Sequence, residues 1–231
     1  MKRKSSILKG NTDWASSAGT NTADSEWEVL TPSSTNIATL GSHTYAPVCP
    51  TLGAATSAAQ DLDPSATNTL AATAPCPDGY VATALAGTTS TVIESVHAVC
   101  EPIFLSWLVL GRDTTATATI GAGTGTAAGP VGCNPGEAMV GVEGLWTSGV
   151  GTGSFTELVP LCLSLKSIAT DASPDGAARR GAIDGSGTPG ANTGKTLCAA
   201  GEVMTGLSGF TDPVLAGGRV TELRASCRPI P

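Results

Sequence analysis

The chain has 231 residues with a formal net charge of −7, and only 13% of its residues are charged and 4% aromatic. Four of the twelve basic residues stand within the first nine positions, which leaves eight basic against nineteen acidic side chains in the remainder. An acidic body repels phosphate backbones, so we expect no nucleic acid as a partner. The abundance of Gly, Ala, Thr and Ser favours sheets over helices.

The apolar segments are too short for a membrane or a secretory signal. The longest run is IFLSWLVL at 103–110, far below the roughly 18 residues of a spanning helix. The basic start offers only Ile7 and Leu8 where a secretory signal has an apolar run of about 7–15 residues. We therefore expect no membrane insertion.

Residues 1–40 are polar and lack a regular apolar period. We predict that they form an extended N-terminal arm and that residues 41–231 form a repeated β body. The basic residues of the arm are compatible with a solvated tail or with contact to an anionic surface.

A partial repeat unit follows at 41–52, where YAPVCPTL matches the segments that surround Cys100, Cys162 and Cys227. It is a closing strand without an opening one. Three interpretations of Cys49 stay open: a free buried thiol, a bridge between subunits, or a competing pairing within the chain.

Three complete repeat units, which we call modules, are predicted at about 70–105, 127–165 and 192–231. Each opens on Cys-x-x-Gly: CPDGYVATALAG from Cys76, CNPGEAMVGVEG from Cys133 and CAAGEVMTGLSG from Cys198. Alternate positions keep their apolar or Thr character over seven residues, which predicts a strand with one buried face. Gly141 and Gly206 inside two of these strands indicate bulges or a close backbone approach.

Glycines also stand at both ends of each predicted strand, where turns need positive φ. They are Gly79, Gly136 and Gly201 before the strands, and Gly87, Gly144 and Gly209 after them.

A second shared segment ends each module: IESVHAVCEPI, FTELVPLCLSL and VTELRASCRPI. One module is then a strand, a glycine-rich hairpin loop and a returning strand, with a cysteine at each outer end. Antiparallel neighbours can bring such cysteines within a disulfide's Cα separation, and each bridge would contribute about 3 kcal/mol. The predicted pairs are Cys76–Cys100, Cys133–Cys162 and Cys198–Cys227; the alternative is reduced thiols buried as small apolar side chains.

Many short strands at turn-marked spacing predict an all-β fold, and three copies of one motif predict pseudo-threefold symmetry. The repeated Cys-x-x-Gly strand, glycine turn and returning strand ending in Cys resembles the vitelline membrane outer layer protein I family over about residues 70–231. This resemblance implies a β-prism of three sheets and a non-catalytic structural or carbohydrate-binding role in an extracellular coat. The chain departs from that family in its orphan Cys49, in lacking a secretion signal and in having few tryptophans in its glycine-rich turns.

Residues for catalysis or metal binding are scarce. The chain has two histidines, His43 and His97, and no paired Cys/His spacing typical of zinc. Glu157 and Glu222 occupy matching positions with Glu94 one residue offset, which is compatible with a cation or sugar site, although polar strand faces explain them more simply. We expect neither enzyme activity nor a cofactor or metal.

The segment GANTGKT at 190–196 looks like a phosphate-binding loop, but Pro189 stands where the pattern requires the first glycine. Its alignment with the segment before Cys133 predicts instead the entry turn of the third module, with Lys195 as a surface residue.

Two functions follow from these features. The first is a structural subunit of an external assembly, such as a phage virion decoration or tail component or an extracellular coat, with other protein subunits as partners and the arm as its grip. Release by lysis or particle assembly would bring it to an oxidising extracellular or virion-surface location. The alternative is a lectin-like β-prism protein that binds surface glycans, with Trp146 stacking on a sugar.

Overall fold

The chain forms two compact units, Met1–Val48 and Cys49–Pro231, in a computed structural model. The structure describes residues 2–4, 13, 17–21, 23–28, 52–57, 62, 72–104, 109–111, 113–121, 125–147, 153–186, 190–212 and 219–230.

The first unit contains one strand pair among its described residues. Strand β1 (Lys2–Arg3) lies antiparallel to β2 (Trp27–Glu28). The indole Nε1 of Trp27 donates to Ser17 Oγ at 2.8 Å, and Ser17 Oγ donates to Glu26 Oε2 at 2.9 Å. The extended arm expected over residues 1–40 stays a prediction, and the boundary of this unit lies at Val48.

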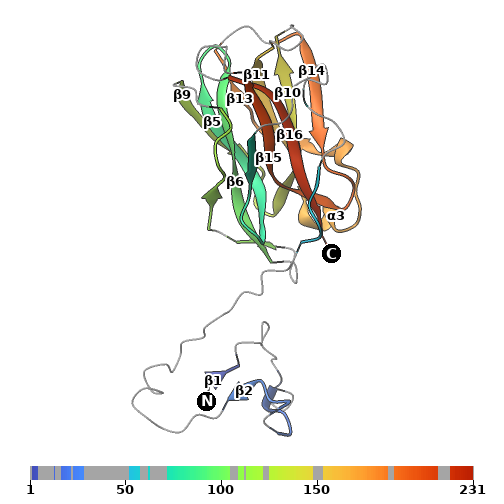
Figure 1. Ribbon diagram of the computed structural model, residues 1–231. Coiled ribbons are helices and arrows are strands. Elements are labelled where there is room, and N and C mark those ends of the chain that lie inside the picture. The colour runs from blue at the N-terminus through green and yellow to red at the C-terminus, as the bar shows by residue number, and fades with distance from the viewer. Residues whose placement is uncertain are drawn as a thin grey trace, which may run out of the picture. The chain divides into compact units, whose positions relative to one another are not determined.

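The second unit is all-β, as predicted, with three antiparallel sheets arranged around a common core (Figure 1). Each predicted module is a hairpin of two long strands: module 1 is β5 (Tyr80–Thr89) and β6 (Ile93–Phe104), module 2 is β10 (Glu137–Trp146) and β11 (Phe155–Ser164), and module 3 is β15 (Glu202–Asp212) and β16 (Arg219–Pro229). Short elements complete the unit: β3 (Thr56–Ser57), β7 (Val109–Leu110), β8 (Thr115–Ala116), α3 (Leu165–Ile168), the 3-10 turn Pro174–Gly176, β12 (Ala178–Arg179) and β13 (Ile183–Asp184).

Every sheet takes one strand from the segment that leads into the next module. Strand β9 (Thr126–Gly132) precedes module 2 but pairs with β5, and β14 (Asn192–Leu197) precedes module 3 but pairs with β10. Strand β4 (Ala72–Pro75) precedes module 1 and pairs with β15, which closes the ring. The prediction of an entry turn at Lys195 was wrong, because this segment is a strand that covers an otherwise open sheet edge.

The Cys-x-x-Gly motif forms the turn that opens each module. Its glycines have φ of 79°, 83° and 76° at Gly79, Gly136 and Gly201, a conformation that residues with a Cβ rarely adopt. Each glycine carbonyl accepts a bond from the N–H three residues beyond the closing cysteine, as in Ile103 N to Gly79 O at 3.0 Å. The motif therefore connects the two ends of its own hairpin.

An extra residue interrupts the first strand of each module. The register shifts across Thr83, Val140 and Thr205, so that each is a bulge. The prediction of one buried face was wrong, because Val81 and Ala82 are both fully buried. Of the two alternatives predicted at Gly141, the close backbone approach is confirmed, because a Cβ there would collide with the carbonyl oxygen of Thr196. The bulge itself lies one residue earlier, at Val140.

The later glycines serve a different purpose from the one predicted. Gly87, Gly144 and Gly209 lie inside strands and do not have positive φ. A Cβ at Gly87 would collide with the carbonyl oxygen of Ser95 on the neighbouring strand. These positions are small because strands or core side chains pass close to them.

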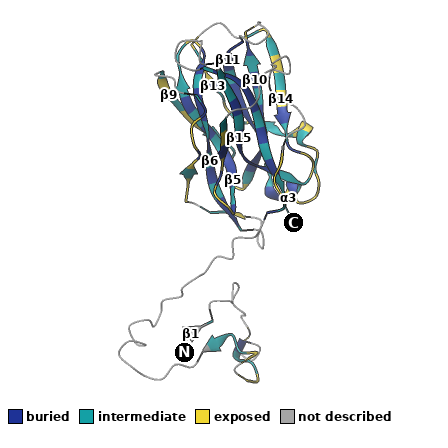
Figure 2. Cartoon of the chain, viewed as in Figure 1, coloured by how far each residue is buried: buried dark blue, intermediate teal, exposed yellow. Residues whose placement is uncertain are grey.

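Three disulfides connect the same cysteines that the spacing pairs, with Cα separations of 5.9, 5.6 and 5.6 Å for Cys76–Cys100, Cys133–Cys162 and Cys198–Cys227. Their sulfurs lie within the main apolar core, and burial is concentrated on the long hairpin strands (Figure 2). A second apolar cluster gathers residues from the cysteine ends of all three modules, including Val81, Val203 and Ile168.

Candidate functional site

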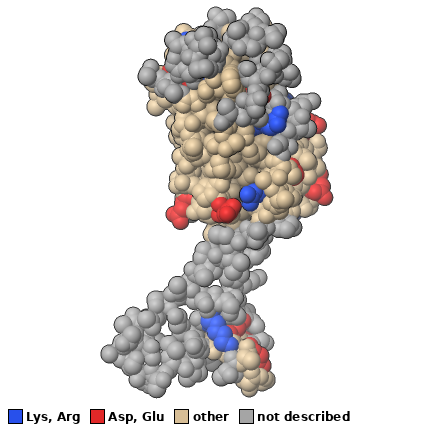
Figure 3. Space-filling view, viewed as in Figure 1, with Lys and Arg blue, Asp and Glu red and all other residues tan. Residues whose placement is uncertain are grey.

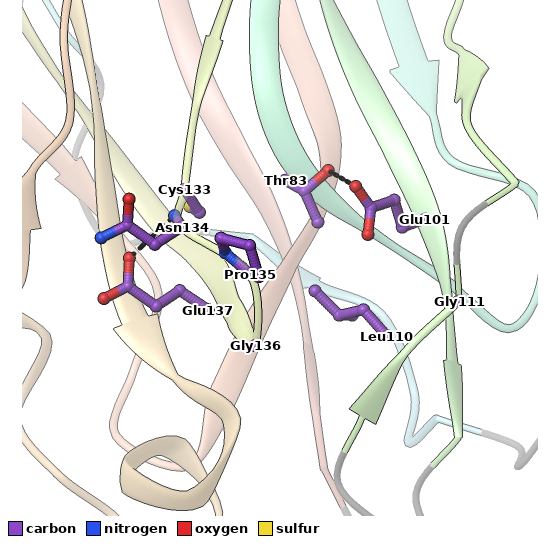
Figure 4. Close-up of a pocket in the computed structure, with 9 residues that line it drawn as sticks. All are labelled: Thr83, Glu101, Leu110, Gly111, Cys133, Asn134, Pro135, Gly136 and Glu137. Carbon is purple, nitrogen blue, oxygen red and sulfur yellow. Dashed lines mark hydrogen bonds between the residues drawn. The ribbon is translucent and has the colours of Figure 1, made fainter.

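A cleft of about 500 Å³ lies at the junction of modules 1 and 2, and we call it the 1/2 cleft (Figure 4). Module 1 supplies the bulge and the strand after its closing cysteine, and module 2 supplies its opening turn. The lining residues are Thr83, Glu101, Leu110, Gly111, Cys133, Asn134, Pro135, Gly136 and Glu137.

Backbone hydrogen bonds hold the two walls of this cleft together. The N–H of Cys133 donates to the carbonyl of the bulge residue Thr83 at 2.8 Å. The N–H of Gly111 donates to Pro102 O at 2.7 Å, which positions Leu110 along the edge of β6. Because these contacts are made by backbone groups, the side chains are left to determine what the cleft holds.

Both modules supply polar side chains to the lining, and those of Asn134 and Glu137 point away from Thr83 and Glu101 (Figure 4). Thr83 Oγ1 donates to Glu101 Oε1 at 3.3 Å (Figure 4). Glu137 Oε2 accepts from Asn134 N at 3.0 Å and from Arg180 Nε at 3.0 Å. The hydrogen bonds from the Arg180 guanidinium hold the pKa of Glu137 below its ordinary value, so Glu137 is an anion that Arg180 already balances.

This lining is suited to a hydroxyl-rich ligand. The Glu101 carboxylate can accept hydrogen bonds, the Asn134 amide can donate and accept, and the Thr83 hydroxyl, which donates its proton to Glu101, can accept. Leu110 and Pro135 supply apolar surface beside these groups. Polar groups next to an apolar wall are typical of small-ligand sites.

The same junction occurs twice more, with different side chains. The opening cysteine donates to the bulge carbonyl at each: Cys198 N to Val140 O at 2.9 Å and Cys76 N to Thr205 O at 2.8 Å. At the 2/3 junction Val140, Leu165 and Ile168 are each 1% exposed and belong to one apolar cluster. That junction is therefore packed with apolar side chains rather than open to a polar ligand.

Trp146 is not the exposed sugar platform that the sequence predicts. It ends β10 at 9% exposure within the main core, and its ring meets Phe155 edge-on with centroids 6.1 Å apart. Gly194 on β14 makes room for this ring, since a Cβ there would lie 2.8 Å from it. Trp146 is a core residue because the β14 strand covers it. Residues 148–152 and 213–218 of the glycine-rich hairpin loops, and Cys49, lie outside the described residues.

The three matching carboxylates lie on three different sheets. Glu94 on β6 accepts from Gly125 N at 3.0 Å, Glu157 on β11 pairs with Arg179 at 3.4 Å, and Glu222 on β16 is 2% exposed. Within the part of the chain that the structure describes, no group of three or more His, Cys, Asp and Glu could hold a metal ion. His97 lies on β6, where burial lowers the pKa of its imidazole.

The GKT segment has a structural explanation. Lys195 lies 3.8 Å from the Glu143 carboxylate across the outer face of its sheet. Thr196 is fully buried, and its Oγ1 accepts from Ala225 N at 3.0 Å. A strand that buries its threonine against module 3 does not cradle a phosphate, since that cradle joins a strand to a helix.

No family model and no curated protein sequence matches this chain. Among solved structures, the chain is similar to wild-type Malaysian banana lectin (12% identity, 77% of this chain and 91% of that one, TM-score 0.41). It is also similar to a mannose-binding jacalin-related lectin from Ananas comosus (15%, 68% and 90%, 0.41) and to the Calystegia sepium agglutinin (10%, 78% and 98%, 0.40).

Two surface properties bear on the partners. On the face of the body in view, charged atoms lie in small separate groups among uncharged ones, without a basic surface (Figure 3). Among the described residues, no helix has the length and apolarity to cross a membrane.

The residues of the 1/2 cleft were missed by the sequence reading, although a signal for them exists. Thr83 aligns with Val140, and Glu101 aligns with Leu163, one residue after each closing cysteine. A polar residue where another copy of the same repeat is apolar marks a position with different surroundings. The polar residue indicates a cleft only when the positions of the bulge and the junction are known.

Proposed function

We propose that this chain is a non-enzymatic carbohydrate-binding protein that takes a neutral, hydroxyl-rich ligand in the 1/2 cleft. The observation that carries this proposal is the hydrogen-bonded pair Thr83 and Glu101, which lines the cleft beside Leu110. The carboxylate of Glu101 supplies charge-assisted hydrogen bonds to ligand hydroxyls, which are about twice as strong as neutral ones. The same negative charge disfavours anionic ligands.

Binding without catalysis fits the lining of this cleft. Cys133 is in a disulfide and cannot act as a nucleophile. The carboxylate of Glu137 is kept ionised by Arg180, which is the opposite of what a general acid needs. No histidine lines the cleft among its described residues, so a nucleophile, base and orienting group are not assembled there.

An extracellular location is supported by the three disulfides, because such bridges persist in oxidising compartments. A role as a particle subunit held by residues 1–40 stays a prediction, as does membership of the vitelline membrane outer layer protein I family.

The proposal is tested by glycan-array screening of the full chain, followed by calorimetric titration of the best neutral glycan. Glu101→Gln keeps the side-chain shape and removes the charge. Since a hydrogen bond to a charged group is worth about 1.5–3 kcal/mol, we expect binding to weaken by roughly ten- to a hundredfold. Glu157→Gln is the matched control, because Glu157 lies on β11 and does not line the cleft.

Two outcomes would contradict the proposal: an array on which the folded chain binds no neutral glycan, or equal affinity of the Glu101→Gln and Glu157→Gln variants.

A further inference from the structure

The junction of modules 3 and 1 contains a second cleft, which repeats the backbone of the first. We call it the 3/1 cleft; its volume is about 130 Å³. Thr205 is its bulge residue, and Gly53 N donates to Pro229 O at 3.1 Å in the way that Gly111 N donates to Pro102 O in the 1/2 cleft. Its lining residues are Leu52, Ala55, Pro75, Cys76, Pro77, Gly79, Tyr80, Thr205, Ser226 and Arg228.

The charge of the 3/1 cleft is the reverse of that of the 1/2 cleft. Arg228 stands one residue after its closing cysteine, where module 1 has Glu101. Tyr80 begins its strand where module 2 has Glu137. The two clefts thus share a scaffold while one presents a carboxylate and the other a guanidinium.

The appearance of Tyr80 has a local cause. In modules 2 and 3 a glutamate at the first strand position accepts from the N–H that follows the opening cysteine, as in Glu202 Oε2 with Ala199 N at 3.1 Å. Module 1 has Pro77 at that place, which has no N–H to satisfy. Module 1 therefore needs no acceptor at its first strand position, and Tyr80 lines the cleft there.

Arg228 is available for a ligand. Its side chain is 31% exposed, and its ion pair with Asp78 spans 3.5 Å to a carboxylate that is itself 96% exposed. Such an exposed pair contributes little and exchanges readily. A guanidinium forms paired hydrogen bonds with a carboxylate, and the partial burial of Arg228 strengthens that attraction relative to open water.

Groups for the rest of a sugar lie beside Arg228. Ser226 lines the cleft, and its hydroxyl lies 3.3 Å from Ser208 Oγ. Tyr80 and the buried Leu52 form an apolar wall. A carboxylate next to hydroxyls and an apolar ring face is the chemistry of an acidic sugar.

We propose that the 3/1 cleft is a second binding site, which takes the carboxylate-bearing terminal residue of an acidic saccharide through Arg228. It does not depend on the 1/2 cleft binding a neutral sugar. With both sites, one chain would bind neutral sugars in the 1/2 cleft and acidic sugars in the 3/1 cleft.

The test is calorimetric titration of the full, oxidised chain with a glucuronate-terminated disaccharide and with its neutral, glucose-terminated counterpart. Because the 1/2 cleft is proposed to take neutral sugars, the two probes are compared on the Glu101→Gln chain. There we expect the acidic probe to bind at least tenfold more tightly than the neutral one and to weaken as salt rises. Arg228→Gln should reduce acidic-probe binding at least tenfold, and Arg228→Lys should recover part of it, because lysine keeps the charge but not the paired geometry. A sialyl-terminated probe that binds with the same dependence on Arg228 also supports the site.

Two controls separate this proposal from the first one. Arg179→Gln removes an arginine that is 55% exposed on another sheet, and Glu101→Gln alters the 1/2 cleft; both should leave acidic-probe binding unchanged. Thermal unfolding of each variant checks that it folds. The proposal is overturned if folded Arg228→Gln binds the acidic probe as the parent does, if both probes bind the Glu101→Gln chain equally, or if Glu101→Gln abolishes binding of both.

Discussion

The 2/3 junction and the 1/2 cleft share the same backbone hydrogen bond, but apolar side chains fill the first and polar side chains line the second. In both, an opening cysteine donates to the carbonyl of a bulge residue. Val140 lies in an apolar cluster with Leu165 and Ile168 at one, whereas Thr83 bonds to Glu101 in an open cleft at the other. The symmetry of the repeat therefore determines where a junction lies, and two or three side chains decide whether it stabilises the fold or is free to bind.

The difference can be traced to the segment after each closing strand. Module 2 continues into α3, whose N-cap Ser164 accepts from Ser167 N at 3.1 Å and whose buried residues are Leu165 and Ile168. The following turn brings Asp171 against Gly201, at the opening turn of module 3. Module 1 continues into an edge strand, β7, whose Leu110 is only partly buried. A filled junction gains stability, while an open one keeps room for a ligand.

The variant Ile168→Ala tests this comparison with the largest expected loss in the free energy of unfolding. Ile168 is 1% exposed, and removal of such a side chain costs about 2–5 kcal/mol. The equivalent truncation in the open cleft, Leu110→Ala, should cost about 1 kcal/mol or less because Leu110 stays partly exposed. Urea unfolding of both variants, with the disulfides intact, measures the difference; equal losses would show that both junctions are structural.

A smaller effect is expected from the charged wall of the 1/2 cleft as pH falls. The pKa of Glu137 is lowered by Arg180, so its folded value lies under the unfolded value of about 4.3. Its contribution is therefore complete above that unfolded pKa and is lost as pH falls through the folded one. Glu137→Gln should be less stable than the parent at pH 7 and should approach it at the acid end.

Unfolding midpoints between pH 7 and pH 3 measure this dependence. Arg180→Gln should likewise reduce the fall of the unfolding midpoint between pH 7 and pH 3, because it removes the other partner of the hydrogen bond. If both variants lose stability with falling pH as the parent does, the Glu137–Arg180 pair contributes nothing to the stability of the fold.

The smallest effect is expected outside the junctions, on the outer face of the sheet that contains β14. Lys195 is 44% exposed and 3.8 Å from Glu143, and exposed pairs contribute about 0–1 kcal/mol. Lys195→Ala should therefore shift the unfolding midpoint only slightly and should leave glycan binding unchanged. A large loss of stability would mean that β14 depends on this pair and not on its buried Thr196.

The site was less predictable than the fold. Trp146 is an aromatic residue at a glycine-rich loop, which predicts a sugar platform, but β14 lies 46 residues further along the chain and covers it, as its pairing with Asn192 shows. Glu101 and Asn134 are far apart in sequence and line the same cleft only because β9 joins module 1 before the chain enters module 2.

The sequence by itself determined the three hairpins, their opening turns and their cysteine pairs, because each depends on contacts within about 30 residues. Glycine at positive φ in an opening turn and the span of a disulfide are local properties that residue types encode. Only the tertiary structure decided which edge each entry strand covers, which junctions are filled and which tryptophan is buried. Those outcomes depend on packing between segments distant in the chain, where many pairings satisfy the same local pattern.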